Sequence, residues 1–257
     1  MMNPRTATVC AVLLLATGCP KQPEFGMEAP GRPTVTWRHD ETDSTEKPAA
    51  DAAKEKETER TLLAEYRESE WHGTEDLAMA RTLSSLAILR RQQGALAEAE
   101  QLYRRALTIR ERTQGPDHPD VAATLNNLAG VLAAQGNYDA AQPALERALT
   151  IRQKTLGNDH VLTAESLNNL ALLYAAQGNA DAAEPLYQRA VAVLEKNGST
   201  HAGGLDRVLD NYAALLDDTG RDSEAEALKA RARDLRAAGG QPAEGAPPQS
   251  SSTHRTP

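Results

Sequence analysis

The sequence has few aromatic residues and an excess of acidic over basic side chains. Aromatic residues make up 4% of the 257 residues, and the formal net charge is −8. So few rings offer no stacking platform for unpaired bases, and an acidic chain gains nothing from counterion release on nucleic acid. We therefore expect no nucleic-acid partner.

The sequence also lacks an apolar run long enough to cross a bilayer. A charged residue, Arg5, precedes the short apolar run 9–16, and small residues follow as far as Cys19. This order is typical of a secretory signal peptide, which we expect to span residues 1–18. An ordinary secretory signal and an uncleaved anchor are alternatives to the lipoprotein signal described next.

Residues 16–19, Ala-Thr-Gly-Cys, resemble the cleavage box of bacterial lipoproteins, in which the cysteine becomes the acylated first residue. The resemblance implies a lipid anchor on Cys19 and a place in the bacterial cell envelope. The following residues, Pro20 and Lys21, differ from the aspartate that retains some lipoproteins at the inner membrane, which favours the outer membrane. The other cysteine, Cys10, would leave with the signal, so no thiol would remain for a disulfide, a metal site or catalysis.

Further along the chain, five sets of residues recur at an interval of 42. One set is Gly94, Gly136, Gly178 and Gly220. The others are four leucines and twelve alanines: Leu83, Leu125, Leu167, Leu209; Ala87, Ala129, Ala171, Ala213; Ala99, Ala141, Ala183, Ala225; Ala106, Ala148, Ala190, Ala232. A period in this range indicates that one supersecondary unit is stacked several times.

Each unit contains two apolar stripes with helical spacing, one on each side of the glycine. In the second unit they are Leu125, Leu128, Ala129, Leu132 and then Ala141, Leu145, Ala148, Leu149. Glycine readily adopts the left-handed conformation that ends a helix. The spacing therefore predicts an antiparallel helix pair in every unit, with small alanines where the two helices approach.

The pattern Leu-x-x-Leu-Ala, then Gly, Ala and Ala, resembles the tetratricopeptide repeat. The 42-residue period and the linker GPDHPDVAATLNNLA resemble the kinesin-light-chain class of these repeats rather than the 34-residue form. The resemblance covers roughly residues 76–237. It implies an all-α, right-handed solenoid of about four helix-turn-helix repeats that binds a protein or peptide in its concave groove and is not an enzyme.

Three segments flank this repeat array. Residues 19–50 are rich in Pro, Thr and acidic side chains and predict a disordered tether, and residues 238–257 predict a disordered tail. Between tether and array, residues 51–75 predict a helix that caps the open end of the stack.

Asparagines on the first helix of the repeats are the main candidate binding residues. Asn127, Asn169 and Asn211 share one register, and Asn126 and Asn168 stand beside two of them. They lie to one side of the buried stripe. In the tetratricopeptide repeats that the sequence resembles, this face lines the concave groove. Asparagine offers a donor and an acceptor to an extended peptide. Side-chain hydrogen bonds between adjacent repeats are the alternative.

The same face changes charge along the array. Arg81 and Arg91 belong to the first repeat, whereas Asp217 and Asp218 belong to the last. Such a gradient could orient a bound segment. The middle repeats lack the basic residues that the carboxylate-clamp subclass needs beside its asparagines, so we do not expect the function of that subclass.

Two other patterns recur between and within the repeats. Asp117-His118 and Asp159-His160 in the linkers could bring metal ligands together, but these residue types also cap helices, and we predict no metal and no cofactor. An arginine register in the second helices, Arg105, Arg147, Arg189 and Arg231, predicts side chains that cover the core and pair with carboxylates such as Glu100, Glu184 and Glu226.

The sequence therefore predicts a membrane-tethered protein- or peptide-binding scaffold of the bacterial cell envelope, serving as an accessory or assembly factor of a larger complex. The alternatives are a metal-dependent enzyme built on the Asp-His linkers and a self-associating structural protein.

Overall fold

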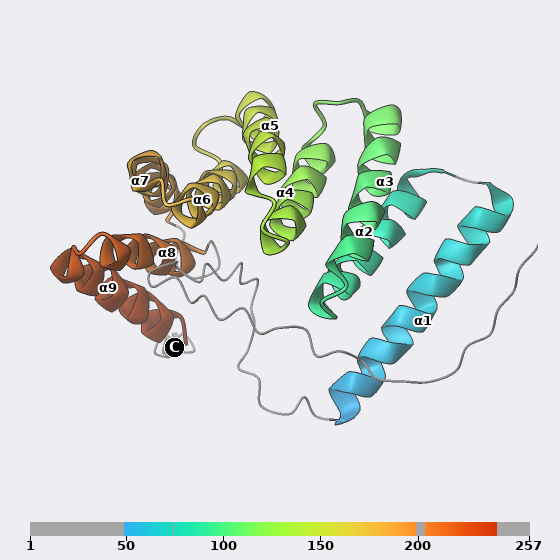
Figure 1. Ribbon diagram of the computed structural model, residues 1–257, viewed down its shortest axis with the longest axis horizontal. Helices are drawn as coiled ribbons and strands as arrows, with labels where there is room; N and C mark the ends of the chain where they lie inside the picture. The colour runs from blue at the N-terminus through green and yellow to red at the C-terminus, as the bar shows by residue number, and fades with distance from the viewer. Residues whose placement is uncertain (1–48, 74, 199–203, 241–257) are drawn as a thin grey trace, which may run out of the picture. The chain divides into compact units, whose positions relative to one another are not determined.

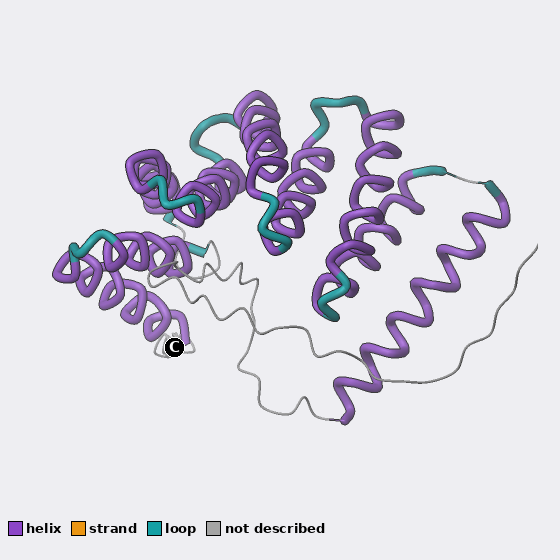
Figure 2. The backbone as a smooth tube through the Cα atoms, viewed as in Figure 1, coloured by secondary structure: helices purple, strands orange, loops and turns teal. Residues whose placement is uncertain are grey.

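The computed structural model describes residues 49–73, 75–198 and 204–240, and these residues form helices joined by short turns, with no strand among them (Figures 1 and 2). The expected signal peptide, Cys19 and nearly all of the expected tether and tail lie outside the described residues. In chain order the helices are α1 (Ala49–His72), α2 (Leu77–Gln92), α3 (Leu96–Gln114), α4 (Pro119–Ala134), α5 (Tyr138–Leu156), α6 (Val161–Ala176), α7 (Ala180–Lys196), α8 (Leu205–Asp218) and α9 (Asp222–Gly240).

The last eight of these helices form four consecutive pairs. Helix α2 packs against α3, α4 against α5, α6 against α7, and α8 against α9, and each pair then packs against the next. The predicted all-α solenoid of four helix pairs is therefore confirmed. The terminal helices slightly exceed the expected bounds, since α1 begins at Ala49 and α9 continues to Gly240.

The repeated glycines form the turn within each pair, as the spacing predicts. Gly136 has a φ of 77°, and the amides of Gly136 and Asn137 donate to the carbonyls of Ala133 and Leu132, both at 2.9 Å. Asn137 then caps α5, because its side-chain oxygen accepts from the Ala140 amide at 3.2 Å. The asparagine after the glycine thus takes part in the turn and also caps the start of the second helix.

The core lies between the two helices of each pair and between successive pairs. Repeated alanines at the helix contacts are fully buried, including Ala87, Ala129, Ala171, Ala213, Ala99, Ala141, Ala183 and Ala225. Their small side chains let the helices approach closely, and large side chains such as Tyr103 and Tyr187 fill the remaining space. Burial raises the pKa of Tyr103 to about 12.

Helix α1 packs on α2 ahead of the first pair, the place expected of a capping helix. Arg90 donates to Glu59 at 2.6 Å, and the hydroxyl of Thr82 donates to Glu65 at 3.1 Å. The Arg105 guanidinium from α3 also lies over the ring of Tyr66, 5.8 Å from its centroid. Of the helices described, none combines the length and the apolarity needed to cross a membrane.

Candidate binding face on the first helices

The candidate binding residues lie on α2, α4, α6 and α8, which are the first helices of the four pairs and are called here the first-helix layer. Helix α4 contacts α6 and α6 contacts α8, so neighbouring members of this layer lie close enough for side chains to meet across the repeat boundary. This proximity decides which asparagines are available to a ligand.

Two of the five asparagines are buried, contrary to the expectation that they project from a binding surface. Asn126 is 6% exposed and Asn168 is 1% exposed. Asn126 lies against Arg152 of α5 and Ser166 of α6. With its oxygen toward the guanidinium, the amide accepts from Arg152 at 2.9 Å and from the Ser166 hydroxyl at 3.1 Å. It therefore joins the second repeat to the third.

Arg152 is the centre of this buried polar cluster. Its guanidinium donates to the Leu162 carbonyl at 2.6 Å and to Ser166 Oγ at 3.0 Å, and lies 3.5 Å from a Glu165 carboxylate oxygen. The Arg152 side chain is 4% exposed, and desolvation lowers its pKa while Glu165 opposes that change. This structural connection was not predicted from the sequence. Its sequence signal was an arginine in the second helix that recurs after 42 residues, at Arg110 and Arg152.

Asn168 belongs to a chain of amides that crosses the next repeat boundary. Asn211 Nδ2 donates to Asn168 Oδ1 at 3.0 Å, and Asn168 Nδ2 donates to Asn169 Oδ1 at 3.3 Å. Inter-repeat bonding, the alternative expected from the sequence, thus occupies Asn126, Asn168 and Asn211.

Asn127 differs from the other four asparagines. It is half-buried, and within the part of the chain that the structure describes it makes no hydrogen bond through its side chain. Asn169 is also half-buried and has a bond only to its neighbour Asn168. Of the five candidate asparagines, these two keep the most unused hydrogen-bonding capacity within the described residues.

The charged candidates lie at the two ends of the layer. Arg81 is exposed and Arg91 is half-buried on α2. On α8, both Asp217 and Asp218 are exposed, and Asp217 pairs with Lys229 of α9 at 2.8 Å. Partial desolvation and the adjacent Asp217 charge raise the pKa of Asp218. Asp218 is thus the more available of the two carboxylates.

The Asp-His linkers have structural partners. His118 and His160 cap α4 and α6, each accepting a backbone N–H through Nδ1 at 3.1 Å. Asp117 pairs with Lys154, and Asp159 pairs with Lys196. Across residues 49–73, 75–198 and 204–240, no group of three or more His, Cys, Asp and Glu side chains is arranged to hold a metal ion.

The family model of the tetratricopeptide repeat matches residues 78–154 and 120–196. These matches cover the first three helix pairs. The fourth pair, α8 and α9, follows them with the glycine turn and buried alanines of the other three. No curated protein sequence matches the chain.

Several solved structures share the fold. BtubC (BKLC) from P. vanneervenii is 26% identical, with a TM-score of 0.65, over 81% of this chain and 84% of that one. The nearly identical TPR-like repeats of a kinesin-light-chain-like protein from Podosopora anserina are 24% identical, with a TM-score of 0.62, over 74% and 90%. Aspartyl phosphate phosphatase F from Bacillus subtilis is 15% identical, with a TM-score of 0.56, over 64% and 42%.

The arginine register of the second helices pairs with partners other than those expected. Arg147 bonds Glu111, and Arg231 bonds Glu195 at 2.6 Å, both on the preceding second helix. For Arg189 the residue at the corresponding position is Gln153, and the guanidinium donates instead to Asn158 at 2.9 Å. The carboxylates named from the sequence were wrong, because the arginines extend back along the stack toward the preceding repeat.

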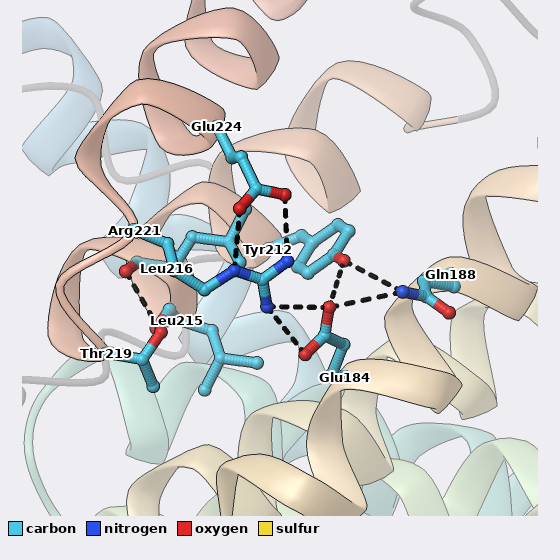
Figure 3. A network of polar contacts seen from close by, with 8 residues as sticks. All are labelled: Glu184, Gln188, Tyr212, Leu215, Leu216, Thr219, Arg221 and Glu224. Carbon is cyan, nitrogen blue, oxygen red and sulfur yellow. Dashed lines mark hydrogen bonds and ion pairs between the residues drawn. The ribbon is translucent and has the colours of Figure 1, made fainter.

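Glu184 instead forms a junction between the third and fourth repeats (Figure 3). It accepts from the Tyr212 hydroxyl at 2.7 Å and from Arg221 at 2.9 and 2.8 Å, and Arg221 also contacts Glu224 through two bonds of 2.8 Å. The bonds from Tyr212 and then Arg221 lower the pKa of Glu184. This network connects the third repeat to the fourth.

Proposed function

We propose that the chain is a membrane-tethered scaffold of the bacterial cell envelope that binds a protein or peptide along the first-helix layer, as an accessory or assembly factor of a larger complex. Tetratricopeptide repeats are protein-binding scaffolds, which supports the general role. The observation that carries the proposal for this face is Asn127, a half-buried amide without a hydrogen-bond partner among the described residues. A bound peptide would supply the missing donor and acceptor.

The proposed tether rests on the sequence before the repeats. A charged start, a short apolar run and Cys19 after Ala-Thr-Gly support acylation at that cysteine. Stable anchoring requires more than one acyl chain, and a lipoprotein anchor carries two or three. The acidic composition gives no attraction to anionic lipid, so the acyl group would hold the protein at the membrane, with the outer membrane favoured.

Replacing Cys19 by serine should remove the anchor. We expect the Cys19→Ser variant, expressed in bacteria, to lose acyl labelling, because serine has no thiol to accept the lipid. The variant should then no longer occur in the membrane fraction as a processed protein. Fractionation with radiolabelled fatty acid measures both effects, with Cys10→Ser as the matched control. A processed, labelled Cys19→Ser protein in the membrane would contradict the tether.

The binding face is tested by a photo-crosslinker placed at Asn127 and, as a control, at Thr150 on the exposed side of α5. A ligand on the first-helix layer should be captured from position 127 and not from position 150. The captured protein, once identified, then serves as the titrant for affinity measurements on purified chains.

In that titration, the Asn127→Ala, Asn169→Ala double variant should weaken binding by about one order of magnitude, since each neutral hydrogen bond contributes about 0.5–1.5 kcal/mol. Asn211 stays unchanged, because it bonds Asn168 within the fold. Far-ultraviolet circular dichroism checks that the double variant is folded. Equal affinities for the folded variant and the wild type would place the ligand on another surface.

A further inference from the structure

Arg110 and Arg152 occupy equivalent positions, 42 residues apart, near the ends of the second helices α3 and α5. Both guanidiniums reach the next first helix. Arg152 bonds the Ser166 hydroxyl, and Arg110 bonds the Thr124 hydroxyl, which stands at the position equivalent to Ser166. The chain therefore builds one arginine site twice, and the surroundings of the two copies can be compared residue by residue.

The copy at Arg152 is complete without a ligand. Glu165 provides a carboxylate, Asn126 an amide and Leu162 a backbone carbonyl, and the guanidinium is 4% exposed. Its charge and its donors are satisfied inside the fold.

The copy at Arg110 lacks both side-chain acceptors. Ala123 stands in the place of Glu165, and Ser84 stands in the place of Asn126. The Ser84 hydroxyl donates to the Ala80 carbonyl at 2.8 Å. No carboxylate among the described residues forms an ion pair with Arg110 or with Arg81, which precedes Ser84 by one turn of α2.

The burial of Arg110 and the charges around it agree with the difference between the two arginine sites. Arg110 is partly buried, and desolvation lowers its pKa. The Arg81 charge acts in the same direction, and the nearby Asp120 opposes it. Asp120 is itself engaged, accepting from the Gln114 amide at 2.8 Å. The first repeat boundary thus holds two guanidiniums with no paired anion.

We propose that Arg110 and Arg81 form a carboxylate-binding subsite of the first-helix layer, which takes an acidic side chain of the bound peptide in the place that Glu165 fills at the next boundary. The guanidinium fork matches a carboxylate with two parallel hydrogen bonds. The subsite rests on the proposed peptide-binding function and deepens it, because it fixes which end of the layer receives the acidic part of the ligand.

The test uses the purified full chain and two synthetic probes, an acetylated decapeptide of alternating Glu and Gly and the same peptide with Gln for Glu. Calorimetric titrations at one fixed, low ionic strength give both dissociation constants. We expect the wild type to bind the Glu peptide about tenfold or more tightly than the Gln peptide, since hydrogen bonds to a charged group are stronger than neutral ones.

Two variants at one position locate the subsite. Ala123→Glu supplies the internal carboxylate that Glu165 provides to Arg152, and should abolish the preference for the Glu peptide. Ala123→Gln adds nearly the same volume without the charge and should retain the preference. Arg81→Ala should reduce it. Circular dichroism confirms that each variant is folded.

Equal affinities of the wild type for the two probes would overturn the subsite, and so would an undiminished Glu preference in folded Ala123→Glu. The proposed function would survive either result if the partner captured from position 127 still bound the wild type more tightly than the asparagine double variant. If the asparagine double variant bound that partner as tightly as the wild type, the proposed binding on the first-helix layer would itself be contradicted.

Discussion

Replacing Tyr187 by alanine should lower the free energy of unfolding by about 3–5 kcal/mol, the usual cost of deleting a buried aromatic ring. Tyr187 is fully buried in α7, and its ring stacks on Tyr212 of α8 with 5.7 Å between centroids. It therefore contributes to the core of the third repeat and to its boundary with the fourth. Urea unfolding followed by far-ultraviolet circular dichroism measures the loss.

Tyr187→Phe is the matched control, because it keeps the ring and removes only the hydroxyl. That hydroxyl is buried and has no hydrogen-bond partner among the described residues, and burial raises its pKa. An unsatisfied buried hydroxyl costs stability, so the phenylalanine variant should be as stable as the wild type or up to about 1 kcal/mol more stable. A large loss in Tyr187→Phe would show that the hydroxyl has a partner after all.

The helix pairs could be predicted from the sequence because they depend on local spacing. The turn between the two helices of a pair needs a left-handed φ, which the glycine before the second apolar stripe adopts, as at Gly136. An alanine such as Ala129 is buried where the helices meet in every repeat. Stacking then repeats the same nearest-neighbour contact, so one correctly predicted unit specifies the next.

The use of each polar side chain was harder to predict, because it depends on a residue of another helix. Asn126 and Asn127 are adjacent, yet one is buried against Arg152 and the other makes no bond within the described residues. The sequence placed both on one face but could not show that α4 and α6 approach closely enough for Asn126 to reach Ser166. The arginine register failed for the same reason, since its partners lie on the preceding repeat.

Arg152→Leu should lower the free energy of unfolding by about 3 kcal/mol or more, because it removes the donor of several polar groups at this boundary and each buried polar group left unsatisfied costs about 1–3 kcal/mol. The substitution removes one of the two donors to the Asn126 amide and the donor to the Ser166 hydroxyl and the Leu162 carbonyl, and Asn126 and Ser166 are buried. Urea unfolding of the purified chain measures the loss.

The next repeat boundary supplies the control for this prediction. Leu194 and Val208 occupy there the positions of Arg152 and Ser166, and both are buried, so the same repeat geometry accepts an apolar pair. Combining Asn126→Leu and Ser166→Val with Arg152→Leu removes the buried polar side chains that the arginine bonds, and should therefore recover about 1–2 kcal/mol, because well-packed apolar groups can replace a buried polar contact. Recovery would assign the loss in the single variant to unsatisfied polar groups. If this triple variant were less stable than Arg152→Leu alone, the cost would instead come from a shape at this boundary that only the arginine fills.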